Sequence, residues 1–153
     1  MIEQHERLFT EFEREVTRNT PLMLMQRMSD RMHMEFVRYN WVGFYVVDSD
    51  DADSLLLGPH AGSFTPHVRI SLSQGLCGAA ASTRSLVVVN DVKSDPRYLQ
   101  GSEHTKSEIV APLLAHGKLV GTLDINSYFK DNWTHKEQAF VEKCAALVSR
   151  ALG

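Results

Sequence analysis

Three polar side chains interrupt two apolar runs between Ser107 and Ser127. Glu108 stands in the first run, and Asp124 and Asn126 stand in the second. Residues two apart on a strand project from one face, so Asp124 and Asn126 point the same way. A carboxylate buried alone among apolar side chains is unfavourable by several kcal/mol, and two carboxylates repel each other unless a cation lies between them. If Glu108 joins the same face, the three groups therefore make a pocket suited to an amine.

The direction of Glu108 depends on the turn that joins the two runs. A two-residue turn at 116–117 places Glu108 on the face opposite Asp124, whereas a three-residue loop over 115–117 sets Glu108 directly across from Asp124. We predict the three-residue loop, or an equivalent bulge near Pro112, because either brings the polar groups together. The alternative is a buried polar network that only orders the sheet.

The chain holds two cysteines, which are too few for a disulfide framework. Cys77 lies between glycines at an expected helix N-terminus, which would lower the pKa of its thiol and favour a reactive thiolate. A small packing residue is the alternative at this position. Cys144 falls on the apolar stripe of the last helix, where we expect an inert core residue.

Hydrophobic periodicity predicts helices at both ends and strands between them, which is an α+β architecture. The helices should pack on one face of a mostly antiparallel sheet, with the pocket on the other face. The polar segment 91–106 is the candidate lid. The expected helices cover 2–19, 21–36, 79–83 and 133–152, and the expected strands before the final hairpin cover 40–47, 55–57, 67–72 and 86–90.

The second helix contains five of the six methionines. Methionine repacks easily, so this helix is either an adaptable partner-binding surface or ordinary core, and we favour core. Thr20 should cap this helix, with Pro21 in its first turn. Thr134 and Glu137 should form a capping box at the start of the last helix.

The composition argues against several classes of function. The 153 residues carry a formal net charge of -3 with scattered Lys and Arg, which does not indicate nucleic-acid binding. No apolar run approaches the ~20 residues of a membrane span, and the charged N-terminus is not typical of a signal peptide, so we expect a cytoplasmic protein. Neither HExxH nor CxxC occurs, and His67 with Cys77 supplies only two ligands, so we expect no metal and no cofactor.

Seven motifs within residues 40–127 follow a distinctive order: NWVGFY, LLLGP, HVRI, GLCGAA, VVVNDV, SEIVAPL and GTLDINS. This order resembles the free methionine-(R)-sulfoxide reductases, a branch of the GAF domain family. The resemblance implies a six-stranded antiparallel sheet, a homodimer, and an enclosed pocket for a free amino acid or its sulfoxide. We therefore expect one GAF domain over 1–153, with N-terminal helices in 1–37, the sheet and pocket in 40–127, and the C-terminal helix in 133–152.

The family's pocket residues match this chain one at a time. Its Trp and Tyr match Trp41 and Tyr45, and its pocket Glu matches Glu108. Its two acids match Asp124 and Asn126, the second of which is an amide here. An aromatic face beside carboxylates favours an ammonium group, in agreement with an amine-bearing ligand.

The family's catalytic cysteines match poorly. The resemblance implies a lid nucleophile seven residues before the pocket Glu, where this chain has Gly101, and an upstream cysteine where it has His67. Only Cys77 is retained. The first hypothesis is therefore a binding domain without catalysis, because sulfoxide reduction by thiols needs a sulfur that reaches the substrate. The second is an active reductase that uses Cys77 and an external thiol.

Overall fold

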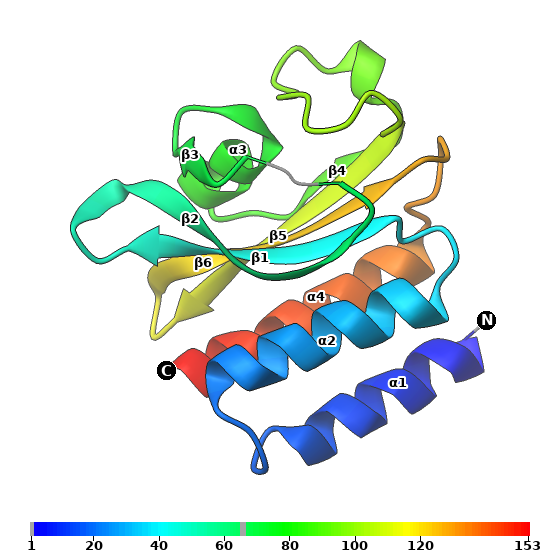
Figure 1. Ribbon diagram of the computed structural model, residues 1–153, viewed down its shortest axis with the longest axis vertical. Helices are drawn as coiled ribbons and strands as arrows, with labels where there is room; N and C mark the ends of the chain where they lie inside the picture. Colours follow the sequence, from blue (N-terminus) through cyan, green and yellow to red (C-terminus); the bar gives the residue numbers. More distant parts are fainter. Residues whose placement is uncertain (1, 65–66) are drawn as a thin grey trace.

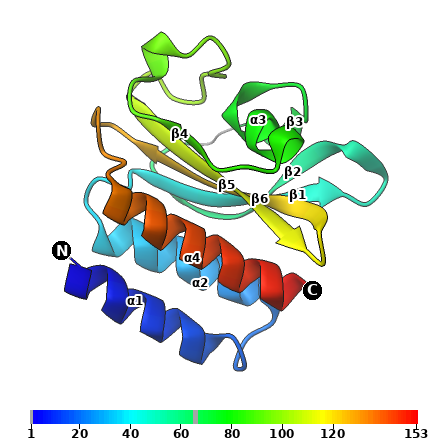
Figure 2. The same cartoon turned by 180° about the vertical axis from the view of Figure 1, so that it is seen from behind.

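The computed structural model describes residues 2–64 and 67–153. Its elements form layers on the two sides of one sheet (Figure 1). Three long helices cover one face, with α2 and α4 against the sheet and α1 outside them, while α3 and the segment 91–106 lie on the other face; the view from behind agrees (Figure 2). The helices are α1 (Ile2–Glu15), α2 (Pro21–Glu35), α3 (Gly75–Thr83) and α4 (His135–Leu152), with a 3-10 turn at Val92–Ser94.

The sheet has six strands in the order β3-β2-β1-β6-β5-β4, and every neighbouring pair is antiparallel. The predicted α+β architecture is confirmed. The central pair β1–β6 places the WVGFY stretch beside the LDINS stretch, which brings the expected site residues onto neighbouring strands. The strands are β1 (Trp41–Asp48), β2 (Asp51–Gly62), β3 (Arg69–Ser71), β4 (Val87–Val89), β5 (Ser107–Ala115) and β6 (Lys118–Ser127).

The predicted helix starts are largely confirmed. Thr20 caps α2 by accepting the N–H of Met23, and Pro21 occupies the first turn. Thr134 caps α4 by accepting the N–H of Glu137. Only this half of the expected capping box forms, because the Glu137 carboxylate instead accepts the Tyr39 hydroxyl at 2.5 Å.

The main core lies between the sheet and the helices. Alternate residues of β1, Val42 and Phe44, point into it and are fully buried. The methionines at 25, 28 and 32 are fully buried in the same core, as expected, while those at 23 and 34 are exposed. No helix among the described residues is long and apolar enough to cross a membrane.

The prediction of a three-residue loop between β5 and β6 is wrong. His116 and Gly117 form a two-residue turn, both with positive φ, which is the backbone that matches the twist of a hairpin. A bulge follows at once: Leu113 pairs with Gly121 and Leu114 with Leu119, so Val120 has no partner. The extra residue shifts the pairing of β5 with β6 by one position, so Glu108 lies on the same face of the sheet as Asp124.

The alternative form of the prediction, a bulge near Pro112, is therefore confirmed. Glu108 does not lie directly across from Asp124, as the three-residue loop required, but across from Asn126. Val110 is the residue paired with Asp124. The three polar side chains still share one face, because Glu108 and Val110 are two residues apart.

Several element boundaries also differ from the prediction: α1 ends at Glu15 rather than residue 19, and β2 begins at Asp51 rather than residue 55. β2 does not end at Gly58 but continues to Gly62, because a bulge opposite Phe44 accommodates Gly58 and Pro59. β3 pairs with β2 only over 54–56. Pro59 lies beyond this paired stretch, so its missing N–H removes no hydrogen bond between β2 and β3. α3 begins at Gly75 rather than residue 79, which places Cys77 inside its first turn.

Candidate functional site

A small hollow lies on the sheet face opposite the three long helices. Tyr45, Glu108, Asp124 and Asn126 supply its floor from strands β1, β5 and β6, and Cys77 supplies one wall from α3. The cavity volume is about 30 Å³, roughly the space of one water molecule. Phe64, Leu99 and Gly101 close it on the outside.

Glu108 and Asp124 form a buried acid pair, 6% and 5% exposed. Asp124 Oδ1 accepts the Asn126 amide at 3.3 Å, and Asp124 Oδ2 accepts the Cys77 thiol at 3.4 Å. A carboxyl oxygen of Glu108 lies within 4.8 Å of one of Asp124. Burial, then the neighbouring Asp124 charge, raises the pKa of Glu108 well above its usual value, and burial also raises the pKa of Asp124.

Cys77 does not have the lowered pKa that its helix position suggested, and that expectation is wrong. Burial raises the pKa of the thiol well above its ordinary value, and the Asp124 and Glu108 charges raise it further. Thr122 donates its hydroxyl to Cys77 Sγ at 3.6 Å, which acts in the opposite direction. Because two carboxylates lie beside the sulfur, the helix terminus does not decide its charge.

The two aromatic residues occupy different positions relative to the hollow. Tyr45 lines it and donates its hydroxyl to the carbonyl of His67 at 2.8 Å. Trp41 does not line it. The Trp41 ring instead stacks on Phe64, which does, with 5.8 Å between ring centroids.

Hydrogen bonds tie the segment 91–106 to the pocket. Thr105 donates its hydroxyl to Asn126 Oδ1 at 3.2 Å. The ring N–H of His67 donates to the carbonyl of Gln100 at 2.9 Å, next to Gly101. The segment predicted as a lid therefore lies over the hollow and contacts its floor.

Sequence reasoning missed several residues of this site. Thr122 bonds the sulfur, and its place two residues before Asp124 on one strand could have indicated this role. Thr105, Phe64 and Leu99 come from irregular segments, where no periodicity indicates direction.

The same side chains raise the question of a metal ion. The ligand atoms of Cys77, Glu108 and Asp124 all lie within 4.8 Å of one another. Among the described residues no other His, Cys, Asp or Glu joins this group. Structural zinc takes four protein ligands, so these three buried side chains do not complete such a site.

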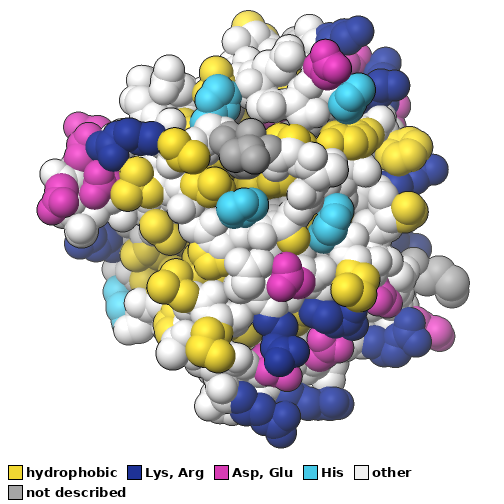
Figure 3. Space-filling model, viewed as in Figure 1, with side chains coloured by type: hydrophobic (Ala, Val, Ile, Leu, Met, Phe, Trp, Pro, Cys, Tyr) yellow, Lys and Arg dark blue, Asp and Glu magenta, His cyan; other side chains and the backbone are white. Residues whose placement is uncertain are grey.

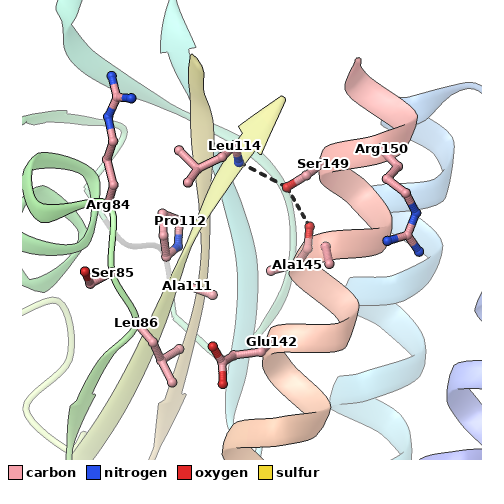
Figure 4. Close-up of a pocket in the computed structure, with 11 residues that line it drawn as sticks. Arg84, Ser85, Leu86, Ala111, Pro112, Leu114, Glu142, Ala145, Ser149 and Arg150 are labelled. Carbon is pink, nitrogen blue, oxygen red and sulfur yellow. Dashed lines mark hydrogen bonds between the residues drawn. The ribbon is translucent and has the colours of Figure 1, made fainter. Parts of the chain in front are cut away.

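A larger groove lies between β5 and α4, with a volume of about 590 Å³ (Figure 4). β4 pairs with β5 only up to Val110, so the next residues of β5 form one side of this groove. Ser149 in this groove accepts the N–H of Leu114 at 3.1 Å and donates to the carbonyl of Ala145 at 2.8 Å. Among the described residues that line the groove there is one carboxylate, that of Glu142, and no Cys or His, so the groove has no counterpart of the acid pair and its thiol.

Comparison with known proteins agrees with this architecture. The model of the GAF domain family matches residues 21–152. The free methionine-R-sulfoxide reductase of Saccharomyces cerevisiae is 36% identical over 116 residues, which cover 75% of this chain and 64% of that protein. The chain thus spans less than two thirds of this relative's length.

Solved structures extend the likeness over most of the chain. Free methionine-R-sulfoxide reductase from Neisseria meningitidis, in complex with its substrate, superposes with a TM-score of 0.90 at 28% identity, covering 96% of this chain and 87% of that one. The type II enzyme of Thermoplasma acidophilum gives a TM-score of 0.80 at 33% identity, covering 86% and 92%. The chain therefore belongs to the GAF domain family, and its relatives include proteins named free methionine-R-sulfoxide reductase.

Proposed function

We propose that this protein binds a small molecule with a protonated amine, such as methionine or its sulfoxide, in the hollow over the acid pair. The observation that carries the proposal is the burial of Glu108 and Asp124 side by side. Among the described residues no Lys or Arg lines the hollow. A cation from the ligand would supply the missing opposite charge.

The walls of the hollow support an organic cation. Tyr45 and Phe64 place aromatic rings beside the carboxylates, and an ammonium group is attracted to such ring faces. The related structure from Neisseria was solved with its substrate. Free methionine sulfoxide is therefore the first ligand to test here.

An amino acid is larger than the present cavity, so the cover must open to admit it. Leu99 and Gly101 belong to the irregular segment that closes the hollow. A Cβ at Gly101 would contact only the edge of the Phe64 ring, at 3.4 Å, so the cover is not tightly packed there. We propose that the ligand displaces these residues, with its amine in the hollow and the rest of it beneath the segment.

We propose binding rather than catalysis. Cys77 is the one cysteine at the hollow, and its thiol donates to Asp124 instead of standing as a free thiolate. Cys144 lies in the core on the opposite face of the sheet and cannot act as its partner. Sulfoxide reduction by thiols needs a nucleophilic sulfur at the substrate and a second thiol to resolve the product.

The position of Cys77 in the wall also favours a second candidate function, which is reduction of methionine (R)-sulfoxide with an external thiol completing the cycle. A thiol-dependent assay on the wild type and Cys77→Ser separates the two, with Cys144→Ser as the matched control. Binding alone predicts no turnover by any of the three. Turnover that is lost only in Cys77→Ser would establish the reductase.

Isothermal titration calorimetry tests the binding proposal directly. Methionine and its (R)-sulfoxide should bind, whereas 4-(methylthio)butanoate, which keeps the thioether and carboxylate but lacks the amine, should not. Equal affinity for the analogue without the amine would contradict the proposal. The homodimer and the cytoplasmic location stay predictions, and light scattering on the purified protein tests the first.

A further inference from the structure

We propose that Glu108 and Asp124 share one proton in the empty pocket, and that the ligand's cation replaces this proton on binding. The inference deepens the proposed function and rests on it for the exchange step. The state of the empty pocket follows from the burial and closeness of the two acids and from the hydrogen bonds of Asp124, so it can be tested without any ligand.

The hydrogen bonds show which carboxyl holds the proton. Both oxygens of Asp124 accept hydrogen bonds, one from Asn126 and one from Cys77, which is the pattern of an ionised carboxylate. A carboxyl oxygen of Glu108 lies within 4.8 Å of one of Asp124, and both side chains are buried. Two ionised carboxylates this close in a buried site repel each other, and both oxygens of Asp124 already accept, so Glu108 is the acid left to carry a proton.

Among the described residues no Lys or Arg lines the pocket to compensate a second negative charge. The titratable groups that face the pair are Tyr45 from β1, Cys77 from α3, and His67 and Tyr98 from the irregular segments. The two tyrosines and the thiol are neutral when they are protonated, so none of them supplies a positive charge. The His67 ring directs its Nε2–H to the carbonyl of Gln100, and no ion pair joins this ring to Glu108 or Asp124. A proton between the acids is therefore the remaining way to remove the repulsion.

The exchange keeps the charge of the pocket constant. The empty pair with one proton carries a charge of about -1. When an ammonium group enters, Glu108 releases its proton to solvent, and two carboxylates with one cation again carry about -1. No covalent bond of the ligand forms or breaks in this step. The pocket thus binds a cation without changing the net charge buried in the protein.

Competition between the proton and the cation sets the pH dependence of affinity. While Glu108 is protonated in the empty pocket, releasing one proton makes affinity rise about tenfold per pH unit. A pocket that already holds two ionised carboxylates would show no rise. Glu108→Gln is the matched control, because its neutral amide keeps the shape but has no proton to release.

Calorimetry measures how many protons are released when methionine (R)-sulfoxide binds. The titration is made near neutral pH in buffers with different heats of ionisation. We expect about one proton released by the wild type, none by Glu108→Gln, and weaker affinity in that variant. Binding without proton release, or equal release by both proteins, would overturn the exchange while leaving the proposed function intact.

Carboxyl ¹³C NMR of the empty protein, labelled at the Glu side-chain carboxyl, tests the first half separately. One resonance should titrate well above the usual Glu range and be missing in Glu108→Gln. If every Glu titrates normally, the shared proton is contradicted whether or not a ligand binds. If the shifted resonance is present but no amine binds, the proposed function and the exchange both fail, and the acid pair is structural.

Discussion

The two faces of the sheet each bury one cysteine, and they treat it differently. Cys144 is fully buried among apolar side chains beneath the helices. Cys77, on the other face, is almost as buried but donates to Asp124 and accepts from Thr122. Burial is therefore shared by the two thiols, and the polar neighbours are what distinguish the candidate site from the core.

The charges around the two thiols show the same contrast. Burial raises the pKa of both, but Lys143 partly offsets this effect at Cys144. At Cys77 the nearby Asp124 and Glu108 add to it. The carboxylates beside Cys77 have no Lys or Arg among the described residues that line the hollow. On the surface of the helical layer, Lys and Arg lie interspersed with Asp and Glu (Figure 3).

The largest effect on stability should come from the helix face. Phe44→Ala removes a fully buried ring from the main core and should lower the free energy of unfolding by about 3–5 kcal/mol. Urea denaturation measures the loss, with Asp124→Asn on the other face as the control, expected to cost far less. Equal losses would show that both faces act as one core.

The largest effect on binding should come from the acid pair. Glu108→Gln should weaken an amine ligand by roughly ten- to a hundredfold, because it removes a charge-assisted bond. Asn126→Ala removes only a neutral amide and should cost roughly two- to tenfold. Calorimetry that finds the reverse order would undo the ranking of the two residues.

The acid pair should also make stability depend on pH. The pKa of Glu108 is raised, so between its unfolded and folded values the folded protein holds a proton that the unfolded chain has released. The stabilisation from this bound proton is complete below about pH 4.3. It is lost as pH rises, which lowers the free energy of unfolding by at most about 1.4 kcal/mol per pH unit. Denaturation of wild type and Glu108→Gln from pH 5 to 8 measures it; parallel curves would contradict the raised pKa.

The smallest effect concerns the thiol. Thr122→Val removes the hydroxyl that favours the thiolate of Cys77, so alkylation by a small neutral reagent should slow by about two- to tenfold. A Cys144→Ala background leaves one thiol to follow. A faster reaction in the valine variant would show that access, rather than charge, limits Cys77.

Much of this contrast could be predicted from the sequence, because side chains alternate along a strand and each position therefore indicates a face of the sheet. The two-residue spacing of Asp124 and Asn126 placed both on one face, and the apolar stripe around Cys144 placed that thiol in the core. The turn could not be predicted, because residue types alone do not show that His116 adopts positive φ and that Val120 bulges.

The state of Cys77 was beyond sequence reasoning for a related reason. The residues flanking it in the chain are Leu76 and Gly78, which indicate only a helix start. The groups that raise its pKa are on β5 and β6, and only the folded sheet brings them to the sulfur. Long-range charge, rather than local pattern, determines the chemistry at this position.

A crystal structure of the protein with methionine (R)-sulfoxide tests the central claim most directly. The account predicts the ligand's amine nitrogen within about 3 Å of a carboxyl oxygen of both Glu108 and Asp124, with the segment 91–106 displaced. A ligand seated in the groove between β5 and α4, or one whose amine points away from both carboxyls, would contradict it.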